Sequence, residues 1–343
     1  MLTIPNLKPM FSQWPYRISP HLEKLEKTVE TKLLEWIPDE KVRQNAREID
    51  LALFSATWWP DSTLDRLETM AWYTLWIILW DDVIEDSTFP GSVAFDENLK
   101  IEWLHEEALK YVKHELGLTQ DDGTSPAPLP PTKYCALFQY CAEPFRAQCT
   151  IPERQRIYDE IKYYMDCCEA EQKYFQTGAL PTLERYWDHR FGSSSVNTYN
   201  ALGEYMCGKH IPAELFDTKE MKTMWFELNR HIVAMNDLAS LKNEIRREWL
   251  GLIPIQMHEA NQDLEAAVAF AIDMALVAGQ KTAKAADDLV AMVAHDPEAQ
   301  ANVRAYVEGF KTNLTGNYYW SLVCGRYGVK EYVQQDGSLL VPL

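Results

Sequence analysis

The sequence is short of the residue patterns that build sheets. Glycine contributes only 14 of the 343 residues, and no strict alternation of apolar and polar residues recurs, so strands are hard to find. Long segments with helical spacing dominate instead. Because 47% of the residues are hydrophobic, the chain can bury a sizeable core. With no internal repeat and no clear domain boundary, we expect one all-α domain over residues 1–343 with roughly a dozen helices.

Basic residues are also scarce. The 33 Lys and Arg residues stand against 51 Asp and Glu, which leaves a formal charge of −18 at pH 7. This balance argues against binding nucleic acid or an anionic membrane through a basic face. An anionic substrate would have to be met by local arginines and lysines or by metal ions, because the overall field repels it.

The seven cysteines lack paired CxxC spacing, and neither cysteine nor histidine clusters at zinc-finger spacing. We therefore expect free, buried thiols in a reducing compartment. Residues 1–20 contain no continuous apolar stretch of the signal-peptide kind. The longest apolar run, around residues 72–80, is about half of what a membrane span needs. A cytoplasmic protein without stable membrane association is the expectation.

Three stretches depart from helical spacing. Residues 1–20 are Pro-rich, and we expect an irregular segment that Trp14 and Tyr16 pin to the body. Residues 117–132 form a low-complexity, flexible loop by composition. The small residues Gly192–Ser195 interrupt a helical pattern, either as a kink that exposes backbone groups or as an ordinary loop between two helices. Farther on, helices are expected at about 254–278 and 281–295, with an irregular C-terminal tail.

A long apolar helix ends in a run of carboxylates at residues 81–86. At about 100° per residue, Asp81 and Glu85 lie one turn apart on the same face. Two converging carboxylates suit Mg²⁺, although the same acids could also form the solvated end of an apolar helix. Tyr73 and Ile77 lie on the side of Asp81 and are candidates to line a pocket beneath it.

A second polar set lies on a later helix. Asn236, Ser240 and Glu244 are spaced i, i+4, i+8, within about 80° of arc over two turns. An amide oxygen, a hydroxyl and a carboxylate on one ridge supply hard oxygen ligands of the kind Mg²⁺ prefers. A polar solvent face is the alternative, and the presence of the acidic helix earlier in the chain favours the metal site.

Together the two sets resemble the motifs of class I terpene synthases. Residues 81–85 look like the family's DDxx(D/E) motif, and Asn236, Ser240 and Glu244 match the ligand positions of its (N/D)Dxx(S/T)xxxE motif. Arg190 lies where the family places its diphosphate-sensing arginine.

Features nearer the C-terminus add to the resemblance. The break at Ser194 lies at the family's helix-break effector, and Arg326-Tyr327 resembles its RY pair, with Trp320 six residues earlier. One departure is Asn243, which stands where relatives often carry Lys, with Lys242 one residue before it. The resemblance covers about residues 60–327 and looks most like microbial, fungal-type sesquiterpene cyclases.

The resemblance implies the class I terpenoid synthase fold, an α-helical bundle around an apolar cavity. It also implies a Mg²⁺ cluster, usually of three ions, and a role for each matching residue. Metal ligands would be Asp81, Glu85, Asn236, Ser240 and Glu244. Diphosphate would contact Arg190, Arg326, Tyr327 and Lys242, and Asp82 would bridge to Arg326 on closure. Trp320, Tyr73 and the helix break at Ser194 would stabilise the substrate cation, while Ile77, which stands where relatives often carry Phe, would line the pocket.

The activity implied is Mg²⁺-dependent ionisation of a prenyl diphosphate, most simply farnesyl diphosphate, and cyclisation to a sesquiterpene with release of diphosphate. Three alternatives stay open: a prenyl-chain elongase, a diterpene cyclase that takes a C20 substrate, and a non-catalytic helical scaffold. The asparagine, serine and glutamate of the second motif favour cyclisation, because elongases usually carry a second aspartate-rich motif. The partner is a small-molecule prenyl diphosphate; a homodimer is left open.

Overall fold

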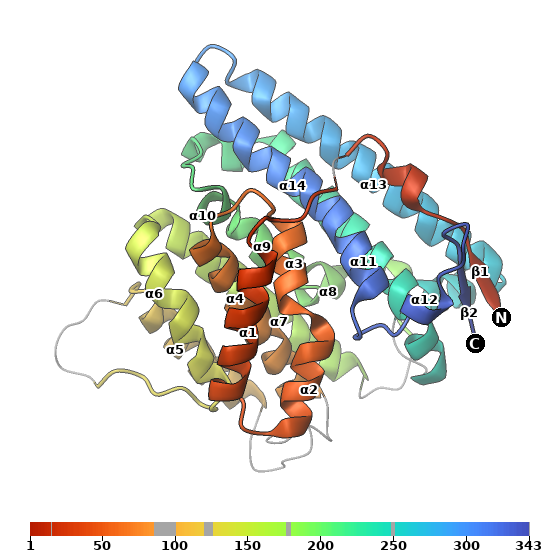
Figure 1. Cartoon of the computed structure of the whole chain (residues 1–343), viewed down its shortest axis with the longest axis horizontal. Coiled ribbons are helices and arrows are strands. Elements are labelled where there is room, and N and C mark those ends of the chain that lie inside the picture. The colour runs from red at the N-terminus through yellow and green to blue at the C-terminus, as the bar shows by residue number, and fades with distance from the viewer. Residues whose placement is uncertain (15, 86–100, 120–125, 176–179, 248–250, 343) are drawn as a thin grey trace.

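The structure is a computed structural model that describes residues 1–14, 16–85, 101–119, 126–175, 180–247 and 251–342. Fourteen α-helices make up nearly all of the regular structure in these ranges, which confirms the predicted all-α class (Figure 1). They are α1 (Leu22–Trp36), α2 (Glu40–Ile49), α3 (Leu51–Trp58), α4 (Leu64–Glu85), α5 (Ile101–Glu115), α6 (Gln139–Gln148), α7 (Ile151–Phe175), α8 (Leu183–Ser193), α9 (Val196–Ala201), α10 (Gly203–Cys207), α11 (Lys219–Arg247), α12 (Leu252–Glu259), α13 (Leu264–Met292) and α14 (Pro297–Val323).

Two short strands bring the ends of the chain together. β1 (Leu2–Ile4) pairs antiparallel with β2 (Leu339–Val341), and Thr3 lies opposite Leu340 (Figure 1). The prediction of irregular structure at both ends was wrong at these residues. Each strand has only three residues, too few for alternation of apolar and polar side chains to be detected. Of the predicted 117–132 loop, residues 120–125 lie outside the described residues.

The predicted helices at about 254–278 and 281–295 were wrongly divided. The chain forms the short α12 and then the continuous 29-residue α13. Gly279, which falls between the two predicted ranges, lies inside α13, where an added Cβ would come within 2.6 Å of the Trp14 ring. The glycine therefore permits close packing rather than ending the helix, and Trp14 pins the N-terminal segment as expected.

α13 is also the one described helix whose length and hydropathy would suffice to cross a membrane. Half of the apolar residues of α13 are alanines, and polar residues such as Asp273 and Lys281 divide the apolar positions into short runs. In the fold, α13 packs along α11 and α14, and its Ala267, Ala271 and Ala275 are fully buried. Its packing is that of a core helix.

Two elements that carry predicted motif residues, α8 and α14, pack against the second motif helix, α11. α4 contacts α3 and α6, α7 contacts α8 and α9, and α11 contacts α14. All seven cysteines are free, and six of them are buried, as expected from the sequence. Asp81, Arg190 and Arg326 lie near helix ends, whereas Asn236 and Ser240 lie within α11.

Candidate functional site where two motif helices meet

Asp81, near the end of α4, is surrounded by groups from three other segments. The Tyr164 hydroxyl of α7 donates to its Oδ1 at 3.4 Å. Burial raises the pKa of Asp81; the nearby Glu171 carboxylate acts in the same direction, while Arg326 and Arg190 oppose it. Two arginines and a second carboxylate therefore converge on this aspartate.

Arg326 lies just beyond the end of α14. Its backbone N–H donates to the carbonyl oxygen of Glu48 at 3.0 Å, which fastens this segment to α2. Burial alone would lower the pKa of Arg326, but Tyr327 and the carboxylates of Asp81 and Asp82 outweigh it and the pKa is raised. The structure thus brings both aspartates of the first motif to Arg326.

Asn236 of α11 connects the second motif to the same place. Its Nδ2 donates to the Tyr327 hydroxyl at 2.6 Å, and its Oδ1 accepts from Arg190 at 3.3 Å. Burial raises the pKa of Tyr327 to about 12. Because Arg190 also acts on Asp81, this arginine lies between the two motif helices.

Asp237 has a role that its sequence position alone did not reveal. Its buried Oδ2 accepts from the Tyr186 hydroxyl at 2.8 Å and from the Leu252 N–H at 2.7 Å, and its Oδ1 lies 3.7 Å from Arg190. Burial raises the pKa of Asp237, and Arg190 opposes that shift. In the sequence, the indication of this role was that Asp237 directly follows Asn236 in the motif. In the fold, Asp237 positions Arg190 and the start of α12.

The remaining predicted metal-binding and diphosphate-binding residues have different partners in the structure. Ser240 donates to the Asn236 carbonyl oxygen of its own helix at 2.9 Å. Lys242 donates to the Tyr332 hydroxyl at 2.7 Å and lies 4.5 Å from the centre of that ring. The side chains of Glu85 and Glu244 lie outside the described residues.

The predicted helix break falls between Ser193, where α8 ends, and Val196, where α9 begins. Ser195 has a φ of 60°, so its backbone adopts the left-handed conformation there. The Ser194 hydroxyl donates to Asn229 Oδ1 at 3.1 Å and accepts from the Val196 N–H at 3.3 Å. The side chain of Ser194 therefore closes the break, and any contact with substrate would come from its backbone.

Several aromatic side chains lie next to these charged groups. Trp320 donates from Nε1 to the Ile49 carbonyl oxygen at 2.6 Å, and its ring meets Tyr327 and Phe54 edge-on. Tyr199 of α9 lies edge-on to Tyr73, with ring centres 5.6 Å apart.

Phe54 and Tyr199 were not predicted, because core and site aromatics look alike in sequence. Tyr73 and Ile77, which were, are both buried on α4, as the pattern of that helix suggested. We name the set Phe54, Tyr73, Tyr199 and Trp320 the aromatic wall.

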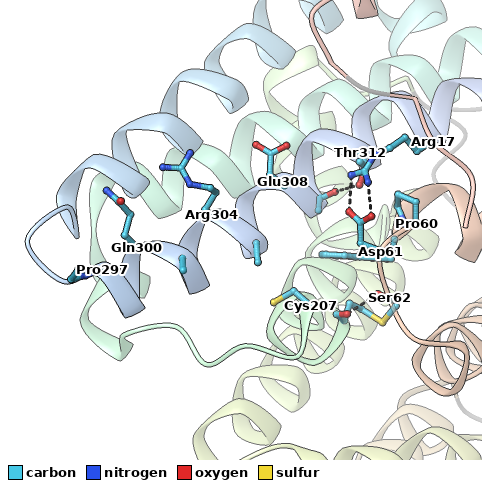
Figure 2. A pocket seen from close by; sticks show the side chains of 15 residues that line it. Arg17, Pro60, Asp61, Ser62, Cys207, Pro297, Gln300, Arg304, Glu308 and Thr312 are labelled. Carbon is cyan, nitrogen blue, oxygen red and sulfur yellow. Dashed lines mark hydrogen bonds and ion pairs between the residues drawn. The ribbon is translucent and has the colours of Figure 1, made fainter.

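A hollow of about 460 Å³ lies elsewhere, between α14 and the segment after α3 (Figure 2). Arg17 and Asp61 form a bidentate ion pair at its edge, with N–O distances of 2.5 and 2.6 Å, and Arg304 and Gln300 line its far side. None of the residues lining it belongs to the motifs. The apolar cavity between the motif helices stays a prediction.

Three further donor groups come together away from the motifs. Atoms of Glu153, Glu204 and His210 lie within 4.8 Å of one another. Their oxygens already have protein partners, however: Glu153 accepts from Thr150, and Glu204 accepts from Ile211 and Arg156. This cluster fastens the loop after α10 to the start of α7.

Comparison with known proteins assigns the fold and the motifs to a family. The model of terpene synthase family 2, C-terminal metal binding, matches residues 73–276, a range that contains Asp81, Arg190 and Asn236. The chain belongs to the terpene synthase family. It is 30% identical to the sesquiterpene cyclase hepA of Aspergillus oryzae, over 99% of this chain and 92% of that protein. It is 25% identical to the terpene cyclase braA of Annulohypoxylon truncatum, over 100% and 90%.

Solved structures agree on the fold of this terpene synthase. The linalool/nerolidol synthase of Streptomyces clavuligerus, in complex with 2-fluorogeranyl diphosphate, superposes with a TM-score of 0.73 at 18% identity, covering 90% of this chain and 97% of that one. The germacradien-4-ol synthase of Streptomyces citricolor gives 0.69 at 17% identity, covering 89% and 95%. The predicted class I terpene synthase and its all-α fold are confirmed.

Proposed function

We propose that this terpene synthase ionises farnesyl diphosphate and cyclises the resulting C15 cation to a sesquiterpene, releasing diphosphate. The observation that carries the proposal is the position of Arg190, which is bonded to Asn236 of one motif and acts on Asp81 of the other. A cation held between two sets of oxygen ligands is suited to grip a diphosphate. The C15 substrate is supported by relatives such as the sesquiterpene cyclase of Aspergillus oryzae.

The residues present fit Mg²⁺. Asp81 is a half-buried carboxylate beside a second carboxylate, Glu171, and a divalent cation would relieve the repulsion between them. The amide of Asn236 and the hydroxyl of Ser240 add hard oxygen donors. We propose that these three residues, with Glu85 and Glu244, hold three Mg²⁺ ions. Bound Mg²⁺ would supply Lewis-acid stabilisation of the departing diphosphate.

The chain's own cations bind and orient the leaving group. Arg190 and Arg326 present guanidinium groups to its oxygens, and Asp237 keeps Arg190 in place at 3.7 Å. The Tyr327 oxygen accepts a hydrogen bond from Asn236, so its own hydrogen can be donated to the diphosphate. Asp82, which lies near Arg326, would hold that arginine as the site closes.

Beneath these groups the aromatic wall and Ile77 surround the prenyl chain. Ring faces stabilise a carbocation through their quadrupoles, and an apolar lining keeps water from the cation before its own double bonds reach it. The carbonyl groups exposed at the Ser194 break would stabilise the first cation formed. Seven free cysteines support a reducing, cytoplasmic setting for this chemistry.

The test is incubation of the purified protein with Mg²⁺ and C10, C15 and C20 prenyl diphosphates in parallel, followed by mass spectrometry of the organic extract. We expect a cyclic C15 product that disappears when EDTA is added. A cyclic C20 product would make the protein a diterpene cyclase. Longer diphosphates that need isopentenyl diphosphate would indicate an elongase. No diphosphate release from any substrate would favour a scaffold.

A further inference from the structure

We propose that Glu160 is the catalytic base of the cyclisation, the group that removes a proton from the last carbocation. The inference rests on the proposed function, because it needs a cation in the space beneath Asp81. It assigns a chemical role to a carboxylate outside the metal motifs and the diphosphate-binding residues.

Glu160 lies on the face of α7 that leads to Asp81. It precedes Tyr164 by four residues, so the two side chains lie on one face of the helix about 6 Å apart along its axis. Tyr164 reaches Asp81 with its hydroxyl at 3.4 Å, and Glu171, seven residues later on the same face, acts on Asp81 by its charge. This face of α7 therefore carries two neighbours of Asp81, and Glu160 lies one turn before Tyr164, toward the start of the helix.

A chain of oriented amides ends at Glu160. Asn229 donates to the Phe191 carbonyl oxygen at 2.8 Å, which fixes which end of its amide is Nδ2. Asn197 Oδ1 then accepts from Asn229 at 3.1 Å and from Asn200 at 3.5 Å. The Nδ2 of Asn197 is left to donate to Glu160, whose carboxylate it stabilises. The helix break thus aims a hydrogen-bond donor at this carboxylate.

The fold does not use Glu160 in an ion pair. Among the described residues no Lys or Arg pairs with it; Arg156, one turn before it, pairs with Glu204 instead. A half-buried carboxylate without a counter-ion costs stability. Burial raises the pKa of Tyr73, a member of the aromatic wall, and the charge of Glu160 adds to that rise. The unfavourable burial of this carboxylate is explained if the carboxylate faces a cationic substrate.

The electrostatics suit proton transfer near neutral pH. Burial raises the pKa of Glu160 to about 7; Asp159 adds to the rise, while Asn197 and Arg156 oppose it. The other titratable groups that interact with it are Tyr163 on α7 and Tyr73 on α4. A base whose pKa lies near the working pH is present as carboxylate and still holds the proton it receives.

In the proposed step, a carboxylate oxygen of Glu160 takes a proton from the carbon next to the cationic carbon. The electron pair of the broken C–H bond forms the new C=C bond, which neutralises the cation and gives a hydrocarbon. The carboxylic acid then returns its proton to water before the next turnover.

Glu160→Gln tests this, with Asp159→Asn, an exposed neighbour on the same helix, as the matched control. We measure diphosphate release, the hydrocarbon profile and the dependence of that profile on pH. Release should stay within a few-fold of the parent protein, while the main hydrocarbon falls at least tenfold against alcohols and early-quenched olefins. The parent's product ratio should change near pH 7 and that of Glu160→Gln should not. Asp159→Asn should keep the parent's hydrocarbon profile, while the pH midpoint of its product ratio moves downward because the charge of Asp159 no longer raises the pKa of Glu160.

An unchanged profile with an unchanged pH dependence in Glu160→Gln would overturn the assignment. If that variant does not fold, Glu160→Asp and Asn197→Ala replace it. Loss of the Asn197 donor should move the pH midpoint of the product ratio upward, because that hydrogen bond lowers the pKa of Glu160. An unchanged midpoint would contradict the proposal. Failure of the proposed function looks different, because the parent protein would then give no cyclic product at all.

Discussion

The hydroxyl oxygen of Tyr327 accepts a hydrogen bond from Asn236 Nδ2 at 2.6 Å, and this contact joins the C-terminal segment to the second motif helix. It fixes the orientation of the Asn236 amide, so that the Oδ1 faces Arg190. One tyrosine therefore orders both a proposed metal ligand and a proposed diphosphate ligand.

Tyr327→Phe should lower kcat/KM by about tenfold, because a neutral hydrogen bond contributes about 1 kcal/mol and the amide loses its orientation. Steady-state kinetics with farnesyl diphosphate checks this. Tyr332→Phe is the matched control, since its hydroxyl accepts from Lys242 instead. Equal losses of kcat/KM in the two variants would contradict a role that is specific to Tyr327.

Arg190→Gln should reduce turnover on the order of a hundredfold, the usual effect of removing a group that stabilises charge developing on the leaving group. Asp237→Asn should reduce turnover less but lower stability by about 1–3 kcal/mol, since a buried acceptor of two hydrogen bonds is altered. Urea unfolding and kinetics separate the two effects. An Arg190→Gln variant with full activity would remove Arg190 from the mechanism.

The double variant Asn236→Ala, Ser240→Ala should need more Mg²⁺ for half-maximal activity, by roughly 10- to 100-fold, because two oxygen ligands are lost. A magnesium titration of diphosphate release measures this. Lys222→Ala, exposed near the start of the same helix, is the control. An unchanged magnesium requirement would show that these two side chains bind no metal.

His231 should make the protein sensitive to acid. It is fully buried, its Nδ1 donates to the Ala275 carbonyl oxygen at 2.7 Å, and burial lowers its pKa to about 4. Since the histidine of the unfolded chain titrates near 6.5, the unfolded state binds the extra proton as pH falls from 6.5 to 4, and stability is lost in that window. The loss between pH 7 and 5 should be about 2 kcal/mol.

Urea unfolding at the two pH values tests this on the parent and on His231→Asn, which cannot titrate. The pH effect should shrink in that variant and persist in His258→Asn, because His258 is exposed. If His231→Asn keeps the whole effect, the acid sensitivity arises elsewhere.

The sequence predicted those local arrangements that depend on spacing within one helix, while the role of the residues in a site stays a prediction. Asp81 on α4 and Asn236 and Ser240 on α11 follow from a fixed rotation per residue, and Gly192–Ser195 marked the helix break by composition. The fold class followed from the absence of strand patterns. These signals are local, so one sequence is enough to detect them.

Features that depend on contacts between distant segments could not be predicted in this way. Asp237 differs from a surface aspartate only because Tyr186 and Leu252 meet it in the fold. Tyr199 joins the aromatic wall because α9 brings it against Tyr73, yet its sequence neighbourhood resembles that of any core tyrosine. The division of α13 into two predicted helices was wrong for the same reason, because Gly279 lies within the helix where the Trp14 ring occupies the space a side chain would take.

The pairing of Leu2–Ile4 with Leu339–Val341 turns the polypeptide into a closed loop held by hydrogen bonds. Asn6 adds to the closure by donating to the Asp336 carbonyl oxygen at 2.7 Å. Arg326 and Tyr327 lie only a short way before β2 in the chain, so the pairing with β1 helps to hold these two proposed diphosphate-binding residues. Fraying at either end would loosen both arginine and tyrosine, and a bulky fusion on the N-terminal side would act on chemistry more than three hundred residues away in sequence.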